Sequence, residues 1–469
     1  MKGVFITIGI LVVNTMFGQK VSRPNVVLIL SDDHSYPFLG SYGNKDVHTP
    51  HLDSLAGTGI AYRNAFVSSP QCTPSRATLL TGRNPVDIRM TRFAATLPRN
   101  IVTFPEILRQ HGYYTGIFGR NYHMDGSGTS KETEEIFQKH HLRTFKDRVD
   151  YLRIGGNNSA FPQFLDFLDS QPSGKPFFCQ ISYNDPHYPW DSTAYTPRAD
   201  TLDYPSDMPD IPEGRQFLAR HYGEIGRMDS LGGLILHELA KRKLDDNTLI
   251  IFMGDNGSAL LRGKGTLYDL GLHVPLVISW KGRIKPNTTS SILVSGEDMA
   301  PTILDAAGVE IPKEITGKSI VSSWKDRTRE IRDYVFAERG AHGTKLPNST
   351  FDFDLSRVVF DKHYKLIYNA LWQISYTPVD VDNSPFWNEL IAENRHHELA
   401  SLFQRLFFST PRPMFEFYDR QNDPHKLHNL IDEPAHAPDI AKLKYQLQEW
   451  MLLNQDYLPL PIPAGQYSK

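Results

Sequence analysis

The chain has 469 residues, of which 40% are hydrophobic and 22% charged, so it can bury one large core and carry a smaller second domain. Its 50 basic and 53 acidic residues give a formal net charge of −3. That balance lacks the basic excess of a nucleic-acid-binding surface, so we expect no nucleic-acid partner. Its two cysteines allow at most one bridge, which excludes a disulfide-dense scaffold.

Residues 1–18 are predicted to be a signal peptide. Lys2 supplies a positive start, residues 4–13 are almost entirely apolar, and polar residues return at Gln19. An uncleaved membrane anchor is the alternative, but the apolar run is much shorter than the roughly 20 residues of a bilayer-spanning helix. We therefore expect cleavage near Gly18 and an exported protein, periplasmic or secreted, without a stable membrane anchor.

Strand-like apolar runs alternate with helical patterns up to about residue 312, which is typical of βαβ units around a mostly parallel sheet. The predicted strands are 26–30, 114–118, 177–183 and 248–253. The predicted helices are 103–112, 217–243 and a run that starts at residue 77. We expect an α/β domain over residues 19–326, with a large mostly parallel or mixed sheet sandwiched by helices.

The pattern changes beyond about residue 327. Short β-like runs at 334–337, 358–360 and 364–368 are followed by irregular segments and a last helix at 440–452. We expect residues 327–469 to form a smaller C-terminal α+β domain.

Polar side chains follow three of the predicted strands. Asp32 and Asp33 follow the first, His187 follows the third, and Asp255 and Asn256 follow the last. In open α/β sheets ligands bind at the carboxyl ends of strands, so we expect these groups to converge. Paired carboxylates with an amide are hard oxygen ligands suited to Ca²⁺ or Mg²⁺, although such pairs are also common in strand-end turns.

The two cysteines have different surroundings. Cys179 lies inside an apolar strand, where a thiol usually serves as a small buried hydrophobe. Cys72 lies in turn chemistry, Ser-Pro-Gln-Cys-Thr-Pro-Ser-Arg at residues 69–76, just before a helical run. Its expected role is therefore chemical, with an incidental buried thiol as the alternative.

Four segments resemble motifs of the type I sulfatase family. Cys-Thr-Pro-Ser-Arg at 72–76 resembles its Cys-x-Pro-Ser-Arg modification signature, and Gly-Arg-Asn-Tyr-His at 119–123 resembles its Gly-Lys-x-x-His. Asp-Pro-His-Tyr-Pro at 185–189 resembles Pro-His-x-Pro, and Arg-Gly-Lys-Gly-Thr-Leu-Tyr at 262–268 resembles Gly-Lys-Gly-Thr-x-Tyr. The resemblance implies an alkaline-phosphatase-like fold.

The C-terminal part continues the resemblance. Residues 415–419, 422–424 and 429–430 are similar to the family's closing Leu-Tyr-Asp-Leu, Asp-Pro and Asn-Leu pattern. Residues 338–342 and 412–413 most resemble the sulfamidase branch, which includes heparan N-sulfatases and bacterial polysaccharide sulfatases. The likeness covers almost the whole mature chain, and it implies that residues 19–326 are the catalytic domain.

The resemblance also implies cofactors and a maturation partner. Cys72 would be oxidised to 3-oxoalanine (formylglycine) by a formylglycine-generating enzyme, and the hydrated aldehyde would offer one hydroxyl to attack sulfur. One Ca²⁺ would be held by Asp32, Asp33, Cys72, Asp255 and Asn256. It would polarise the S–O bonds as a Lewis acid.

The catalytic residues implied by the resemblance are Cys72, Arg76, Arg120, His123, His187 and Lys264. In the family, the equivalent of His123 contacts a formylglycine hydroxyl, and those of His187 and Lys264 meet the scissile oxygen and the sulfate. Arg120 departs from the family, which usually has Lys there. Arg is also a cation but is bulkier and forks its donors, so the exchange affects sulfate geometry.

The predicted function is hydrolysis of sulfate esters, or of sulfamates, on sugars of ulvan, other algal glycans or glycosaminoglycans. Arg339 and His342, just after a predicted strand, are expected to touch this sulfated oligo- or polysaccharide, with solvated loop polarity as the alternative. A phosphonate or phosphate ester hydrolase of the same superfamily is the enzymatic alternative. A non-catalytic sulfoglycan-binding protein is the other, suggested by Arg120.

Overall fold

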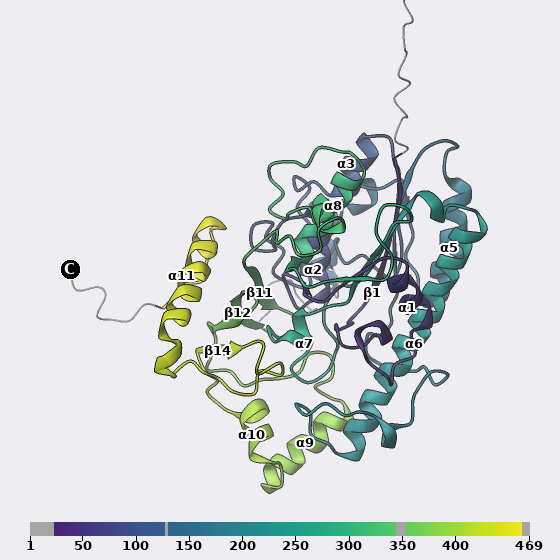
Figure 1. Ribbon diagram of the computed structural model, residues 1–469. Helices are drawn as coiled ribbons and strands as arrows, with labels where there is room; N and C mark the ends of the chain where they lie inside the picture. The colour runs from purple at the N-terminus through teal and green to yellow at the C-terminus, as the bar shows by residue number, and fades with distance from the viewer. Residues whose placement is uncertain (1–22, 127–129, 344–352, 462–469) are drawn as a thin grey trace, which may run out of the picture.

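A large sheet forms the centre of the molecule in a computed structural model that describes residues 23–126, 130–343 and 353–461 (Figure 1). The expected signal peptide lies outside these residues. The sheet has the order β5-β4-β6-β1-β7-β8-β2-β9. Its parallel part comprises β5 (Tyr151–Leu152), β4 (Tyr114–Gly119), β6 (Phe177–Ser182), β1 (Asn25–Ser31) and β7 (Thr248–Gly254).

The other three strands make the sheet mixed. β8 (Leu276–Ser279) runs antiparallel to β7, β2 (Ile60–Tyr62) runs antiparallel to β8, and β9 (Thr288–Ser290) is parallel to β2. A two-stranded sheet of β3 (Ala65–Phe66) and β10 (Val294–Ser295) lies apart from it. The predicted fold class is therefore confirmed for the sheet.

Helices cover both faces of this sheet, because alternate side chains of each central strand point to opposite sides and both sets are apolar. In β1, Leu28 belongs to one buried cluster and Ile29 to another. The first cluster packs under α2 (Cys72–Thr81), α3 (Phe104–Gln110) and α8 (Met299–Ala306). The second packs under α1 (Pro50–Gly57), α5 (Asn157–Ser170) and α6 (Pro212–Lys241), which lie on the opposite side in Figure 1.

The C-terminal part builds a second, smaller sheet. It is antiparallel, in the order β11 (Val335–Ala341), β12 (Phe353–Phe360), β13 (Tyr364–Asn369), β14 (Phe415–Asp419). α11 (Ala437–Leu453) covers one face, while α9 (Pro385–His396) and α10 (Ser401–Phe408) join a cluster with the start of α6. This is the predicted α+β domain; the exact boundary at residue 326 stays a prediction.

Two helices start earlier than the sequence pattern predicted. α2 begins at Cys72 rather than at residue 77, and α6 begins at Pro212 rather than at residue 217. Proline is tolerated in a first turn, where its missing N–H would have no helical partner, so Pro74 and Pro212 do not stop these helices. As a consequence Cys72 lies at a helix N-terminus.

The other α-helices of the described residues are α4 (Lys131–Lys139) and α7 (Asp269–Leu272).

Both cysteines are free and buried, so the possible bridge is not formed. Among the described residues, no helix is long and apolar enough to cross a bilayer.

Gly119 is the last residue of β4 and lies against the end of β6, so replacing it tests how closely these two strand ends must approach. It has φ +86°, and a Cβ there would lie 2.1 Å from the carbonyl oxygen of Ser182. Gly174 has φ +78° with nothing near the same position, so it is a matched control. We expect Gly174→Ala to lower the free energy of unfolding by about 1 kcal/mol, and Gly119→Ala by about 2 kcal/mol more. Equal losses in urea titrations would contradict the steric argument.

Candidate active site

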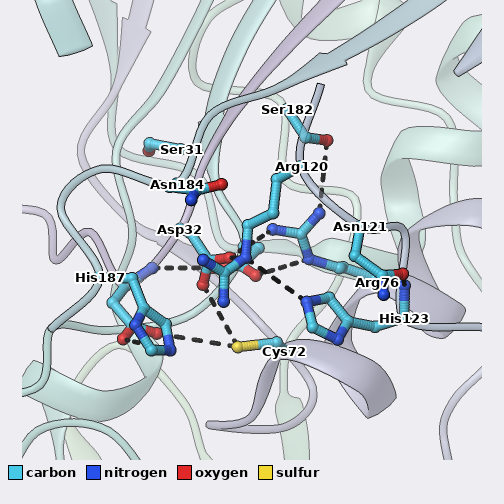
Figure 2. A network of polar contacts seen from close by, with 12 residues as sticks. Ser31, Asp32, Cys72, Arg76, Arg120, Asn121, His123, Ser182, Asn184 and His187 are labelled. Atoms are coloured by element: carbon cyan, nitrogen blue, oxygen red, sulfur yellow. Dashed lines mark hydrogen bonds and ion pairs between the residues drawn. The ribbon is translucent and has the colours of Figure 1, made fainter. Parts of the chain in front are cut away.

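The polar strand ends converge at the N-terminus of α2 (Figure 2). Asp32 and Asp33 directly follow β1, and Asp255 and Asn256 follow β7, which is the neighbouring parallel strand. Asp33 adopts φ +62°, and its backbone N–H donates to Oδ1 of Asp255 at 3.0 Å. The two predicted pairs therefore form one cluster.

This cluster fits a cation. Ligand atoms of Asp32, Asp33, Cys72 and Asp255 all lie within 4.8 Å of one another. The Cys72 Sγ is 3.3 Å from Oδ1 of Asp32 and 3.8 Å from Oδ1 of Asp33. Asn256 donates through Nδ2 to Oδ1 of Asp33 at 2.8 Å, and its own buried Oδ1 has no hydrogen-bond partner among the described residues. An orphaned acceptor beside three carboxylates is what a hard metal ion would satisfy.

The carboxylates of the cluster repel one another. Burial, together with the charge of Asp32, raises the pKa of Asp33 to about 6, and the same two causes raise that of Asp255 to about 6. Burial also opposes ionisation of Asp32, but Arg120 and Arg76 hold its pKa below the usual range. Asp33 and Asp255 are therefore protonated more easily than ordinary aspartates, whereas Asp32 stays ionised.

Arg76 holds two of the carboxylates in place. Its Nε lies 2.8 Å from Oδ2 of Asp255, and Nη2 lies 3.0 Å from Oδ2 of Asp32. Nη1 donates to the Ser182 hydroxyl at 3.3 Å, and the side chain is 1% exposed. The guanidinium is thus surrounded by acceptors of the protein, and it acts by orienting the cluster.

Arg120 and His123 lie in the segment that directly follows β4. Arg120 forms an ion pair with Asp32, and its Nε lies 3.4 Å from Nε2 of His123. Burial and the charges of Arg76 and Arg120 lower the pKa of His123 well below its ordinary value, so its imidazole is neutral. Its buried Nδ1 has no hydrogen-bond partner among the described residues, so it is available to a group bound beside Cys72.

His187 and Lys264 line the opposite side, where Figure 2 shows His187 across the thiol from His123. The Lys264 ammonium lies 2.9 Å from Oδ2 of Asp33 and 2.6 Å from Oδ2 of Asp380. The Nδ1 of His187 bonds to the Tyr188 carbonyl and therefore carries the proton, so Nε2 faces the site. Burial, with the charge of Lys264, lowers the pKa of His187 to about 4.

Asp380 is a site residue that sequence reasoning missed. It lies between β13 and α9, with φ +65°, in a stretch without a recognisable motif. With Asp33 and His187 it forms a second group at metal-binding distance, but the ammonium of Lys264 already bridges the two carboxylates. The alternation of valine and aspartate at residues 379–382 was the only signal.

Arg339 and His342 are buried, at 6% and 5% exposed, and so are not solvated loop residues. Arg339 donates through Nη1 to the carbonyl of Gly265, next to Lys264. His342 lies with Nε2 3.5 Å from Oδ1 of Asp380 and with Nδ1 3.0 Å from the amide of Gln71. Both support the catalytic pocket, and their contact with substrate stays a prediction.

A polar cavity of about 660 Å³ adjoins the site. Arg120 and His187 of the site line it, and its other walls carry groups that hydrogen-bond readily. They include Asn157, Asn158, Ser159, Asn184, Asp185, Tyr188, Asp191 and Arg227.

Comparison with known proteins identifies the family. A family model described as sulfatase matches residues 24–309, which is more than half of the chain. The chain belongs to the sulfatase family. A second model, described as the C-terminal part of N-sulphoglucosamine sulphohydrolase, matches residues 260–407 of this sulfatase. The resemblance to the sulfamidase branch is thereby confirmed, and the protein is a sulfuric ester hydrolase.

Curated relatives agree with this placement. Human N-sulphoglucosamine sulphohydrolase is 29% identical, over 94% of this chain and 92% of its own length. An ulvan-active sulfatase of Formosa agariphila is 28% identical, over 94% of this chain and 76% of its own length. The family implies a formylglycine nucleophile and a metal ion, and the cluster around Cys72 fits both.

Solved structures share the fold. A protein in complex with its substrate D-glucosamine-2-N,6-O-disulfate has a TM-score of 0.68 at 19% identity, covering 93% of this chain and 99% of its own. A phosphonate monoester hydrolase of Silicibacter pomeroyi has a TM-score of 0.67 at 20% identity, covering 93% and 96%. At such identities the likeness concerns the fold alone, so it does not choose between sulfate and phosphonate chemistry.

Removal and return of a divalent cation tests the cluster without an activity assay. A cation that binds only the folded protein stabilises it by about 2.7 kcal/mol at 100 times its Kd, so calorimetry should show a higher Tm than in chelator. The affinity should fall below about pH 6, because protons then compete for Asp33 and Asp255. Asp255→Ala should remove the cation-dependent shift, whereas Asp382→Ala should keep it. A full shift in Asp255→Ala would place the cation elsewhere.

Proposed function

We propose that this sulfatase removes sulfate groups from sugars of sulfated polysaccharides, outside the cytoplasm, with formylglycine at Cys72 and Ca²⁺ in the carboxylate cluster. The observation that carries the proposal is the convergence of Cys72, the carboxylates and two cations, one of which, Arg120, also lines a polar cavity. Relatives named for ulvan and for N-sulphoglucosamine support a saccharide substrate. The apolar N-terminal run supports export by a cleaved signal peptide.

Calcium suits the donor set better than softer metals. Three carboxylates and the free Oδ1 of Asn256 are oxygen ligands, and Ca²⁺ accepts six to eight of these in flexible geometry. When bound, the cation and the formylglycine hydrate would together polarise the S–O bonds and supply the attacking hydroxyl.

Sulfate binding and hydrogen bonding to the reacting groups fall to the protein's own residues. Arg120 pairs with Asp32 and Lys264 pairs with Asp33, the two carboxylates next to the thiol, so both cations are placed to bind sulfate oxygens. The N-terminus of α2 adds a favourable dipole for the anion. His187, fixed through Nδ1 and neutral, presents an unprotonated Nε2 that is placed to accept a hydrogen bond from the formylglycine hydrate or the substrate. Of this pair, Lys264 is the group that carries protons to donate toward the leaving oxygen or nitrogen.

Arg120 does not by itself argue for a non-catalytic binding protein. Its guanidinium is ion-paired with Asp32 and lines the cavity, so a cation is present where the family has lysine. Phosphonate or phosphate ester hydrolysis remains the enzymatic alternative, because sulfur and phosphorus transition states need the same trigonal arrangement of cationic donors.

A desulfation panel tests the proposed function. Protein made with a formylglycine-generating enzyme should release sulfate from at least one of ulvan, carrageenan, fucoidan and glycosaminoglycan oligosaccharides, in the presence of Ca²⁺. N-sulfated and O-sulfated glucosamine in the same panel separate sulfamate from ester hydrolysis. Cys72→Ala should fold and be inactive, and an aryl phosphate should be turned over far more slowly than its aryl sulfate. Faster phosphate turnover would favour the alternative reaction.

Mass spectrometry tests the nucleophile directly. The Cys72 peptide should be about 18 Da lighter than its sequence mass, because conversion of a thiol to an aldehyde replaces CH₂SH with CHO. Cys179 is an internal control, since it is buried in β6 without a matching motif and should keep its mass. The mature N-terminus should be read near Gln19 in the same spectra. Fully active protein with an unmodified Cys72 would overturn the mechanism.

A further inference from the structure

Asp380 differs from the other carboxylates of the site because its side chain is partly exposed to solvent. Its side chain is 26% exposed, whereas those of Asp33 and Lys264 are at most 1% exposed. The neighbouring His187 is 22% exposed and lines the polar cavity. The carboxylate of Asp380 is therefore partly accessible to solvent, beside His187 and Lys264.

The contacts of Asp380 leave part of its acceptor capacity unused. Oδ2 accepts one hydrogen bond from Lys264 at 2.6 Å, and it lies 3.5 Å from Nε2 of His187. Oδ1 lies 3.5 Å from Nε2 of His342. A carboxylate offers about four lone-pair sites, so a further donor can be accepted.

The backbone holds this carboxylate rigidly. Asp380 adopts φ +65°, which is uncommon for a residue with a side chain. The valines on either side, Val379 and Val381, are 6% and 1% exposed and anchor the segment. Val379 also packs against Gly265, whose missing side chain leaves room for it. The position of the carboxylate is thus fixed relative to Lys264.

The negative charge of Asp380 opposes the binding of a sulfate anion unless the substrate also provides a hydrogen-bond donor for this carboxylate. Burial disfavours its ionised form, but Lys264 and His342 hold the pKa of Asp380 below the usual range, so it is an anion. A donor on the leaving group, next to the sulfated position, would gain a charge-assisted hydrogen bond there. A second anionic group in that place would be repelled.

We propose that Asp380 determines specificity by accepting a hydrogen bond from a hydroxyl or amino group adjacent to the sulfated position, and by excluding substrates with a second sulfate there. The inference rests on the proposed function and deepens it, since it names which sulfated sugars the site accepts. It predicts a preference for sugars with a free neighbouring donor over vicinally disulfated ones.

Three small aryl sulfates test this without knowledge of the sugar. 2-Hydroxyphenyl sulfate has a vicinal donor, 2-methoxyphenyl sulfate lacks the O–H, and catechol disulfate has a second anion. We expect the wild type to prefer the hydroxyl over the methoxy compound by about 10- to 100-fold in kcat/KM. In Asp380→Asn that ratio should fall to within about threefold, and catechol disulfate should gain relative to the monosulfates.

Ratios between substrates separate this role from simple support of Lys264. A purely structural role would lower kcat/KM for all three compounds equally and leave the ratios unchanged, which would overturn the inference. Asp382→Asn makes the same chemical change two residues along the chain and should keep the wild-type ratios. If aryl sulfates are not turned over, their inhibition constants against the glycan found active should show the same order of preference, and Asp380→Asn should remove it.

The two proposals fail in different ways. Wild-type protein that releases sulfate from no glycan would overturn the proposed function. Active wild-type protein whose ratios survive Asp380→Asn would overturn only the role of Asp380.

Discussion

Repulsion among three buried carboxylates is the constraint on which the catalytic pocket depends. Asp32, Asp33 and Asp255 meet at the ends of two adjacent strands, where water cannot screen them. Arg76, Arg120 and Lys264 pair with these carboxylates from within the protein, and a bound cation would reduce their mutual repulsion further. The carboxylates make a bound metal ion favourable. They also hold Arg120 and Lys264 close to the nucleophile, where these two cations can bind sulfate.

The sheet makes this concentration of charge possible. β1 and β7 are parallel neighbours, so their carboxyl ends bring residues more than two hundred positions apart into contact. β4 and β6 end at the same edge and supply Arg120 and His187. The strands are apolar and buried on both faces, so packing of the core sets their positions. The same packing holds the polar groups at the strand ends close together despite their repulsion.

Much of the site was predictable because its residues follow apolar strands or lie in short motifs. The carboxylate pairs and His187 could be assigned to one edge of the sheet from periodicity and the carboxyl-end rule alone, whereas Cys72 was joined to them only by its resemblance to the sulfatase motif. Asp380 could not, because only tertiary packing of its loop brings it to Lys264. The early starts of α2 and α6 were also missed, since proline in a first turn weakens the local helical pattern without preventing the helix.

The carboxylates that contact Lys264 come from the parts of the chain that build two different sheets. Asp33 belongs to the large sheet, whereas Asp380 lies on a loop beyond β13 of the small one. The nucleophile and the carboxylate cluster are contained entirely in the first part. A substitution in the loop of Asp380 can therefore change the surroundings of Lys264 while the nucleophile and the carboxylate cluster keep their sequence.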